Sequence, residues 1–267
     1  MAYVDVEALR GPAGVLGVLL LETALGSLLV LLLAPVWGVV KRGYFLLVGW
    51  TVAVCALLGA LSLADPLSRA GSRGSVALAG LWSFVGLSAV VLGLLQTRRE
   101  RPARVLGWLA VVAAVVAVVG IADVRGGTGA MVGGIAAMLT GAAFLGATWD
   151  GMVLGHWYLV DRKLTVHPMR WHAWAYTAGI VLALVSAGLA KGGKPTGSES
   201  ALNPLLLVSD LTLYLAFGLV GICALLAFFV HKLVNEGSIR AATGMLYLAV
   251  IMALSAEFAA KARFFTV

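Results

Sequence analysis

Histidine side chains are the first groups in this sequence that could carry chemistry. The chain has four histidines, and His156, His172 and His231 lie at or near the ends of long apolar segments. Imidazole ligates haem iron and exchanges protons near neutral pH. A b-type haem needs two facing imidazoles, which His156 could supply together with His231 or His172. We therefore take His156 and His231 as candidate iron ligands if a haem is bound.

Aromatic side chains surround these histidines in the sequence. Trp157 and Tyr158 directly follow His156. A quinone site needs an apolar slot, aromatic walls and groups that hydrogen-bond the carbonyls and pass protons. The predicted cofactor site therefore holds a quinone or a b-type haem and comprises His156, His172, His231, Trp157 and Tyr158. The same aromatic residues are also typical of the belt at a membrane interface.

Two carboxyl groups inside apolar segments are the candidates for proton transfer. Glu22 lies near the middle of LGVLLLETALGSLLVLLL, where no basic residue within the segment can neutralise it. We expect it to be uncharged or paired with another buried polar group. Asp150 precedes His156 by six residues, so the two lie roughly 120° apart around a helix and do not share a face. Ionisable groups at such positions are costly and are candidates for function, although they can also simply bond helices together.

The composition indicates the elements that must position these residues. Apolar residues make up 61% of the 267 positions and charged residues 12%, with a mean hydropathy of +1.02. A soluble fold cannot bury so much apolar surface, whereas a bilayer core needs roughly 20 apolar residues per helix. We predict an all-α, polytopic membrane bundle forming one domain over residues 1–267. About eight transmembrane helices are expected near 13–35, 44–63, 75–96, 104–122, 130–157, 173–190, 205–230 and 241–260.

The distribution of Lys and Arg predicts the orientation. Eleven lie in the loops after the first, third, fifth and seventh spans, and eight lie in the other loops and the tails. The larger set is Lys41, Arg42, Arg98, Arg99, Arg101, Arg104, Arg162, Lys163, Arg170, Lys232 and Arg240. The positive-inside rule then places this set in the cytoplasm and both termini outside the inner (plasma) membrane. Contact with anionic lipid explains the net charge of +7, so no nucleic-acid partner is expected.

Small residues and cysteines are assigned to packing. Gly129, Gly133, Ala137 and Gly141 recur at four-residue spacing, which lets helix backbones approach closely and predicts a central position for the fifth span. Cys55 and Cys223 lie among apolar neighbours and are typical packing residues. The absence of a CxxCH or CxxC motif argues against covalent c-type haem and cysteine-ligated clusters.

Taken together, these features favour a membrane subunit of a respiratory redox complex. About eight helices, both ends outside, short loops and a glycine-containing first helix resemble the NrfD/DmsC type of quinone-reactive membrane anchor in bacterial respiratory complexes. The resemblance implies a quinone or haem near the cytoplasmic face and docking of a peripheral redox subunit. Two alternatives remain open: a cofactor-free assembly subunit, and a proton- or cation-coupled transporter or channel using acids such as Glu22, Asp150, Asp210 and Glu257.

Overall fold

The computed structural model describes residues 9, 11–124, 128–161, 163–189, 211–262 and 264. Within these ranges it contains eight helices long and apolar enough to span a membrane, and no strand. The predicted all-α transmembrane bundle is therefore confirmed. The helices are α2 (Pro12–Leu33), α3 (Arg42–Arg69), α4 (Ser72–Gln96), α5 (Glu100–Val124), α6 (Thr128–Val160), α7 (His167–Leu189), α9 (Leu211–Asn235) and α10 (Ile239–Lys261).

Two helix ends differ from the expected spans in ways that matter for the site. Helix α7 begins at His167 instead of near 173, so His172 lies inside a helix. Helix α10 includes Lys261, which lies just beyond the expected span of 241–260. Residues 205–210 of the seventh expected span lie outside the described ranges.

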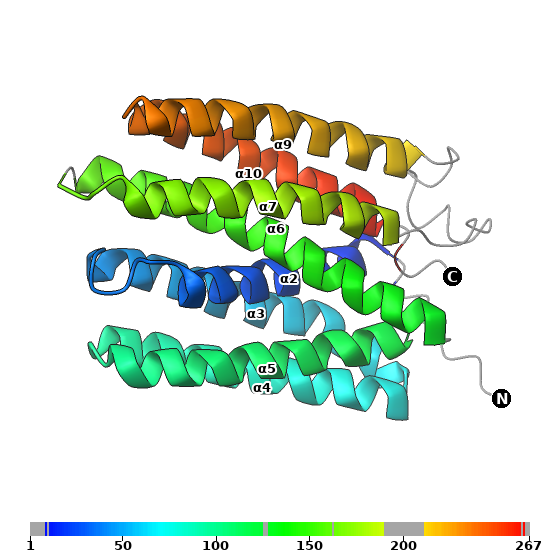
Figure 1. Ribbon diagram of the computed structural model, residues 1–267. Coiled ribbons are helices and arrows are strands. Elements are labelled where there is room, and N and C mark those ends of the chain that lie inside the picture. The colour runs from blue at the N-terminus through cyan, green and yellow to red at the C-terminus, as the bar shows by residue number, and fades with distance from the viewer. Residues whose placement is uncertain are drawn as a thin grey trace.

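Helix α2 runs through the centre of the bundle. It packs against α3 on one side and α6 on the other, while α4 with α5 and α9 with α10 lie at opposite flanks (Figure 1). Its most apolar window is 83% buried, the highest share among the eight helices described. A helix that is apolar all round belongs in such a position. Glu22 is therefore placed in the protein interior and away from lipid.

Glycines allow α2 and α6 to cross with their backbones in contact. A Cβ built on Gly26 would overlap the carbonyl group of Ala142, and one built on Gly146 would overlap the backbone of Gly26. Small residues permit this closeness, which strengthens dispersion contacts between helices in a membrane. Helix α6 contacts α2, α7 and α10, in line with the predicted central position of the fifth span, but the close backbone crossing lies at Gly146 and not at the predicted Gly133.

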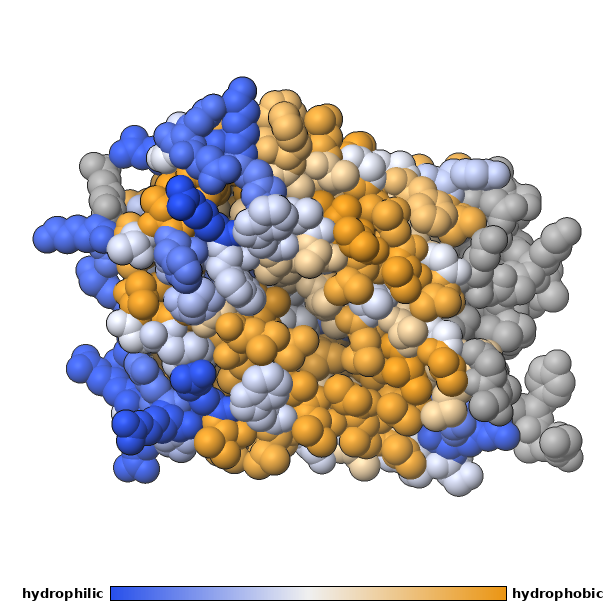
Figure 2. Space-filling view, viewed as in Figure 1, coloured by the Kyte–Doolittle hydropathy of each residue, from blue (hydrophilic) through white to orange (hydrophobic). Residues whose placement is uncertain are grey.

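Basic residues gather at one end of the bundle, which we call the basic end. It comprises the loops after α2, α4, α6 and α9 and is hydrophilic in Figure 2, beside a broad apolar band. Lys41 and Asp161 join two of these loops by an ion pair of 2.8 Å. Hydrogen bonds from the Lys41 ammonium and the Lys163 backbone N–H lower the pKa of Asp161. Because Lys41 is exposed to solvent, this ion pair contributes little to the free energy of unfolding.

Candidate functional site

Three ionisable side chains meet inside the bundle and form what we call the ion-pair centre: Glu22 on α2 and Glu257 and Lys261 on α10. The Lys261 Nζ atom lies 3.0 Å from Oε1 of Glu22 and 2.8 Å from Oε2 of Glu257. All three side chains are buried. The expectation that Glu22 pairs with a buried polar group is confirmed, and its partner is the lysine at the end of α10.

Hydrogen bonds around Lys261 distinguish the two carboxylates. Its ammonium donates to Oε2 of Glu257 at 2.8 Å, to Oγ of Ser186 at 2.9 Å and to the carbonyl of Ala137 at 3.2 Å. These bonds use all three N–H groups of a lysine. Glu22 is held by the ion pair of its Oε1 with the same ammonium, whereas its Oε2 has no hydrogen-bond partner in the described part of the chain. Oε2 of Glu22 is the open acceptor of the centre.

The charges of this centre do not balance. Two ionised carboxylates and one ammonium leave one negative charge in a buried volume, which is costly in a medium of low dielectric. Binding of one proton, or of another monovalent cation, would neutralise it. Oε2 of Glu22 is the available position, because Oε1 is paired with Lys261 and because Glu257 already accepts hydrogen bonds from Lys261 and from the Ser186 hydroxyl, the latter at 3.0 Å.

Gly141 of α6 forms the wall of the ion-pair centre. A Cβ at this position would lie 2.9 Å from Oε2 of Glu257, 2.9 Å from Nζ of Lys261 and 3.0 Å from Oε2 of Glu22. The absence of a side chain on Gly141 therefore makes room for the three charged groups on one face of α6.

A single methyl group at this wall should disturb the centre. We expect Gly141→Ala to lower the free energy of unfolding by about 1–3 kcal/mol, because the added carbon displaces paired charges. The change is measured as a lower apparent Tm of the detergent-solubilised protein. Gly133→Ala is the matched control on the same helix, since its Cβ would lie 4.0 Å from the nearest atom, the Leu189 carbonyl oxygen. Equal Tm values for the two variants would contradict the described wall.

Asp150 belongs to a second buried polar group nearer the basic end. Its carboxyl group and the Ser27 hydroxyl are buried and make no hydrogen bond among the described residues, although Ser27 of α2 lies beside the carboxyl. Gly151, the next residue on α6, packs against His172 of α7, where an added Cβ would lie 3.8 Å from the histidine Cβ. The Tyr44 hydroxyl lies 3.5 Å from Nε2 of His172 on α7. Four helices thus contribute to this group.

The other candidate histidines have different neighbours. His156 is exposed, and its Nδ1 lies 3.1 Å from the Tyr247 hydroxyl. His231 contacts the Thr177 hydroxyl at 2.8 Å and the ring of Trp174. Each of the three imidazoles therefore contacts a different hydroxyl group. Ligation of one haem by His156 with His172 or His231 stays a prediction.

The candidate aromatic residues lie at the same end of α6. The ring of Trp157 packs against Gly43, and its indole N–H has no hydrogen-bond partner in the described residues. The Tyr158 hydroxyl donates to the backbone carbonyl of Thr165. Tyr158 also lines a cavity of about 510 Å³ at the basic end, together with Arg240. Neither aromatic residue contacts the ion-pair centre.

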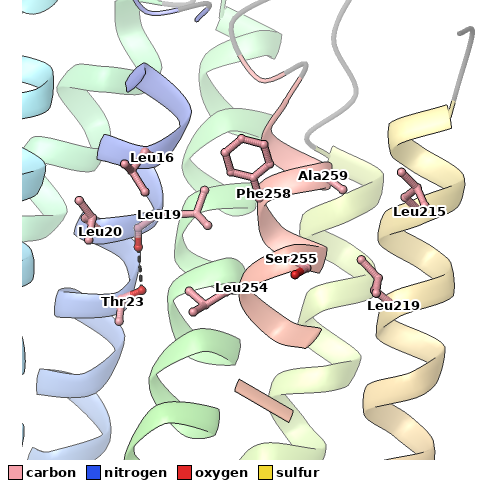
Figure 3. A pocket seen from close by; sticks show the side chains of 10 residues that line it. All are labelled: Leu16, Leu19, Leu20, Thr23, Leu215, Leu219, Leu254, Ser255, Phe258 and Ala259. Carbon is pink, nitrogen blue, oxygen red and sulfur yellow. Dashed lines mark hydrogen bonds between the residues drawn. The ribbon is translucent and has the colours of Figure 1, made fainter. Parts of the chain in front are cut away.

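An apolar groove lies between α2, α9 and α10, and its lining includes Thr23 and Phe258, the sequence neighbours of Glu22 and Glu257. It has a volume of about 520 Å³, and side chains of α2 face those of α9 and α10 across it (Figure 3). Thr23 and Ser255 are its hydroxyl residues, and the Thr23 hydroxyl is already bonded to the Leu19 carbonyl. The other lining residues are Leu16, Leu19, Leu20, Leu215, Leu219, Leu254, Phe258 and Ala259.

Lys261 is the functional candidate that sequence reasoning missed. A lysine four residues after Glu257 shares a helix face with it, so the spacing in the sequence could have predicted this ion pair.

The described residues contain no group of three or more His, Cys, Asp or Glu side chains that could hold a metal ion. Asp210 lies outside the described ranges. No family model matches the chain, and neither the curated proteins nor the solved structures include a significant match.

Proposed function

We propose that this multi-pass membrane protein moves protons within the bilayer and uses the ion-pair centre as a proton-binding site. One observation carries the proposal: a buried centre with two carboxylates and one ammonium leaves Oε2 of Glu22 without a hydrogen-bond donor among the described residues. Ionisable groups in the membrane interior commonly mark proton or ion pathways. Binding a proton at Glu22 neutralises the centre, and losing it restores the charge.

The function class that we favour is a proton-coupled transporter or channel, in which proton binding at Glu22 is coupled to a second process. When Glu22 gains a proton, its attraction for Lys261 falls, while the three hydrogen bonds of Lys261 to Glu257, Ser186 and Ala137 remain. The contact between α2 and α10 is thereby weakened without breaking the rest of the centre. We propose that the basic end faces the cytoplasm, in line with the positive-inside rule.

Infrared spectroscopy of the protein in lipid nanodiscs tests the proposal. We expect a pH-dependent band from a protonated carboxyl group that is absent in Glu22→Gln, and proton flux into liposomes that falls at least about tenfold in this variant. Glu236→Gln is the matched control, because Glu236 is exposed at the basic end. A band and a flux unchanged in Glu22→Gln would overturn the proposal.

A quinone-reactive or haem-binding redox subunit is the second candidate, and the apolar groove is the observation that favours it. A volume of about 520 Å³ lies in the usual range for small-molecule sites, and the apolar lining suits an isoprenoid chain. In this alternative the protein is an anchor of the NrfD/DmsC type with a peripheral redox partner. Two measurements on the purified protein separate the candidates: solvent extraction detects bound quinone, and an absorption spectrum detects the reducible Soret band of a haem. Only the redox subunit requires one of these two results.

A further inference from the structure

A small cavity at the basic end is lined by arginine and apolar side chains. It has a volume of about 200 Å³ and lies near the start of α3, between the end of α4 and the start of α5. Its charged lining residues are Arg42, Arg98 and Glu100, and its apolar ones are the buried Phe45 and Leu95. Sites for whole small molecules usually enclose about 300–1,000 Å³. A cavity of this size therefore suits a single headgroup better than a complete soluble ligand.

Hydrogen bonds to the last turn of α4 fix the position of Arg42. Its Nε atom donates to the carbonyl of Leu95 at 3.2 Å, and its Nη2 atom donates to the carbonyl of Gln96. A guanidinium group has five N–H donors, so three donors of Arg42 stay available in the described part of the chain. Arg42 is thus anchored to the backbone of α4 and still presents donors at the cavity.

Arg98 has a backbone conformation that favours glycine. Its φ is 61°, and the other described residues with positive φ are all glycines. The Arg98 N–H bonds to the Leu95 carbonyl at 3.3 Å, and the Arg99 N–H bonds to the Leu94 carbonyl at 2.9 Å. This is the pattern in which a helix commonly ends with glycine. Arginine at this position costs stability that glycine would not, and a role for its side chain in the cavity accounts for it.

Aromatic rings hold a third arginine close to the same cavity. The ring centroids of Phe45 and Trp37 lie 4.6 Å apart, and the guanidinium carbon of Arg104 lies 5.0 Å from the centroid of the Trp37 ring. The Trp37 indole N–H donates to the Leu31 carbonyl at 2.8 Å, which fixes the ring. Arg104 also follows Glu100 by four residues and therefore shares a face of α5 with this lining residue.

The charges around the cavity do not balance. Within the described ranges, Arg42, Arg98 and Arg104 form no ion pair with an acid, and Glu100 forms none with them. Glu100 lies in the first turn of α5, where the helix dipole stabilises a carboxylate. Three guanidinium groups and one carboxylate leave two positive charges. Arginine binds phosphate oxygens through paired N–H groups, so a phosphate group matches this excess.

We propose that this cavity binds the phosphate headgroup of an anionic membrane lipid. The basic end borders the apolar band of the bundle (Figure 2), and Phe45 and Leu95 belong to the membrane-spanning helices α3 and α4. A lipid places its phosphate at this level while its acyl chains stay in the bilayer. Arg42 and Arg98 hold the phosphate oxygens, and Arg104 adds to the positive potential. This site is separate from the ion-pair centre and does not depend on proton movement.

Native mass spectrometry of the detergent-solubilised protein tests the site with phosphatidylglycerol as the probe. We expect one molecule to bind at least about fivefold more tightly than phosphatidylcholine, which has no net charge. Arg98→Gly should lower the affinity for phosphatidylglycerol about tenfold, because it removes a charged hydrogen-bond donor. The same change relieves the positive φ and should leave Tm of the lipid-free protein at or above the parent value.

Two further variants test the charge of the lining. Glu100→Gln should raise the affinity for phosphatidylglycerol, because it removes the negative charge among the described lining residues. Arg170→Gln is the matched control and should leave the affinity within about twofold of the parent value. Arg170 is exposed at the same end of the bundle, in the first turn of α7, and does not line the cavity.

The outcomes distinguish a lipid site from a soluble phosphate site and from a structural arginine. Equal affinities of Arg98→Gly and Arg170→Gln, or equal binding of the two lipids, overturns the proposal. Displacement of the lipid by an equimolar amount of glycerol phosphate shows that a soluble phosphate ester is the ligand, and the lipid assignment is then wrong. A lower Tm of Arg98→Gly contradicts the described backbone. Weaker lipid binding together with an unchanged or higher Tm supports the site, since a misfolded variant loses both.

Discussion

Replacing Lys261 with methionine is expected to lower the free energy of unfolding by about 3–5 kcal/mol, the usual cost of removing one partner from a buried ion pair. Methionine keeps a long apolar stem but leaves Glu22 and Glu257 without their shared cation. Two close carboxylates in a buried volume must then take up protons or separate. Thermal unfolding in detergent, followed by tryptophan fluorescence, should show an apparent Tm lower by about 10 °C.

Two further variants make the Lys261 experiment decisive. Lys232→Met changes an exposed lysine at the end of α9 and should leave Tm nearly unchanged. Adding Glu22→Gln and Glu257→Gln to Lys261→Met removes the uncompensated charge and should restore a large part of the lost stability. The ion-pair centre would be refuted as a stabilising unit if Lys261→Met unfolded at the temperature of Lys232→Met.

The second large effect is expected at the crossing of α2 and α6. Gly146→Ala places a methyl group onto the backbone of Gly26, which cannot move aside as a flexible side chain can. The two helices must separate along their contact, and we expect a loss of about 3 kcal/mol or more. The same thermal unfolding assay measures it. Because α2 also carries Glu22, the separation should weaken its ion pair with Lys261.

Gly221→Ala on α9 is the control for this prediction, since an added Cβ there meets no atom within 4 Å. Alanine favours a helix over glycine by about 1 kcal/mol, so this variant should be as stable as the parent protein or slightly more so. Equal stability of Gly146→Ala and Gly221→Ala would contradict the close crossing of α2 and α6.

Hydropathy alone determined the fold class and the approximate positions of the helices. An apolar run long enough for the bilayer must become a helix there, because only internal hydrogen bonding satisfies its backbone in lipid. The cost of a buried charge likewise predicted a polar partner for Glu22. The pair of Glu257 and Lys261 was also predictable from the sequence, because residues four positions apart lie on the same face of a helix.

Only the tertiary structure decided which helices bring the polar groups together. Helices in a bilayer meet apolar surroundings on every side, so their sequences carry little amphipathic signal to indicate rotation or neighbours. Packing of the end of α10 beside the middle of α2 joined Lys261 to Glu22. Packing of α3 and α7 near α6 placed Tyr44 and His172 at the group that contains Asp150, whereas His156 and His231 contact other partners. Alternation of the spans put the histidines near one end of the bundle, but the rotation of each helix determined what each imidazole contacts.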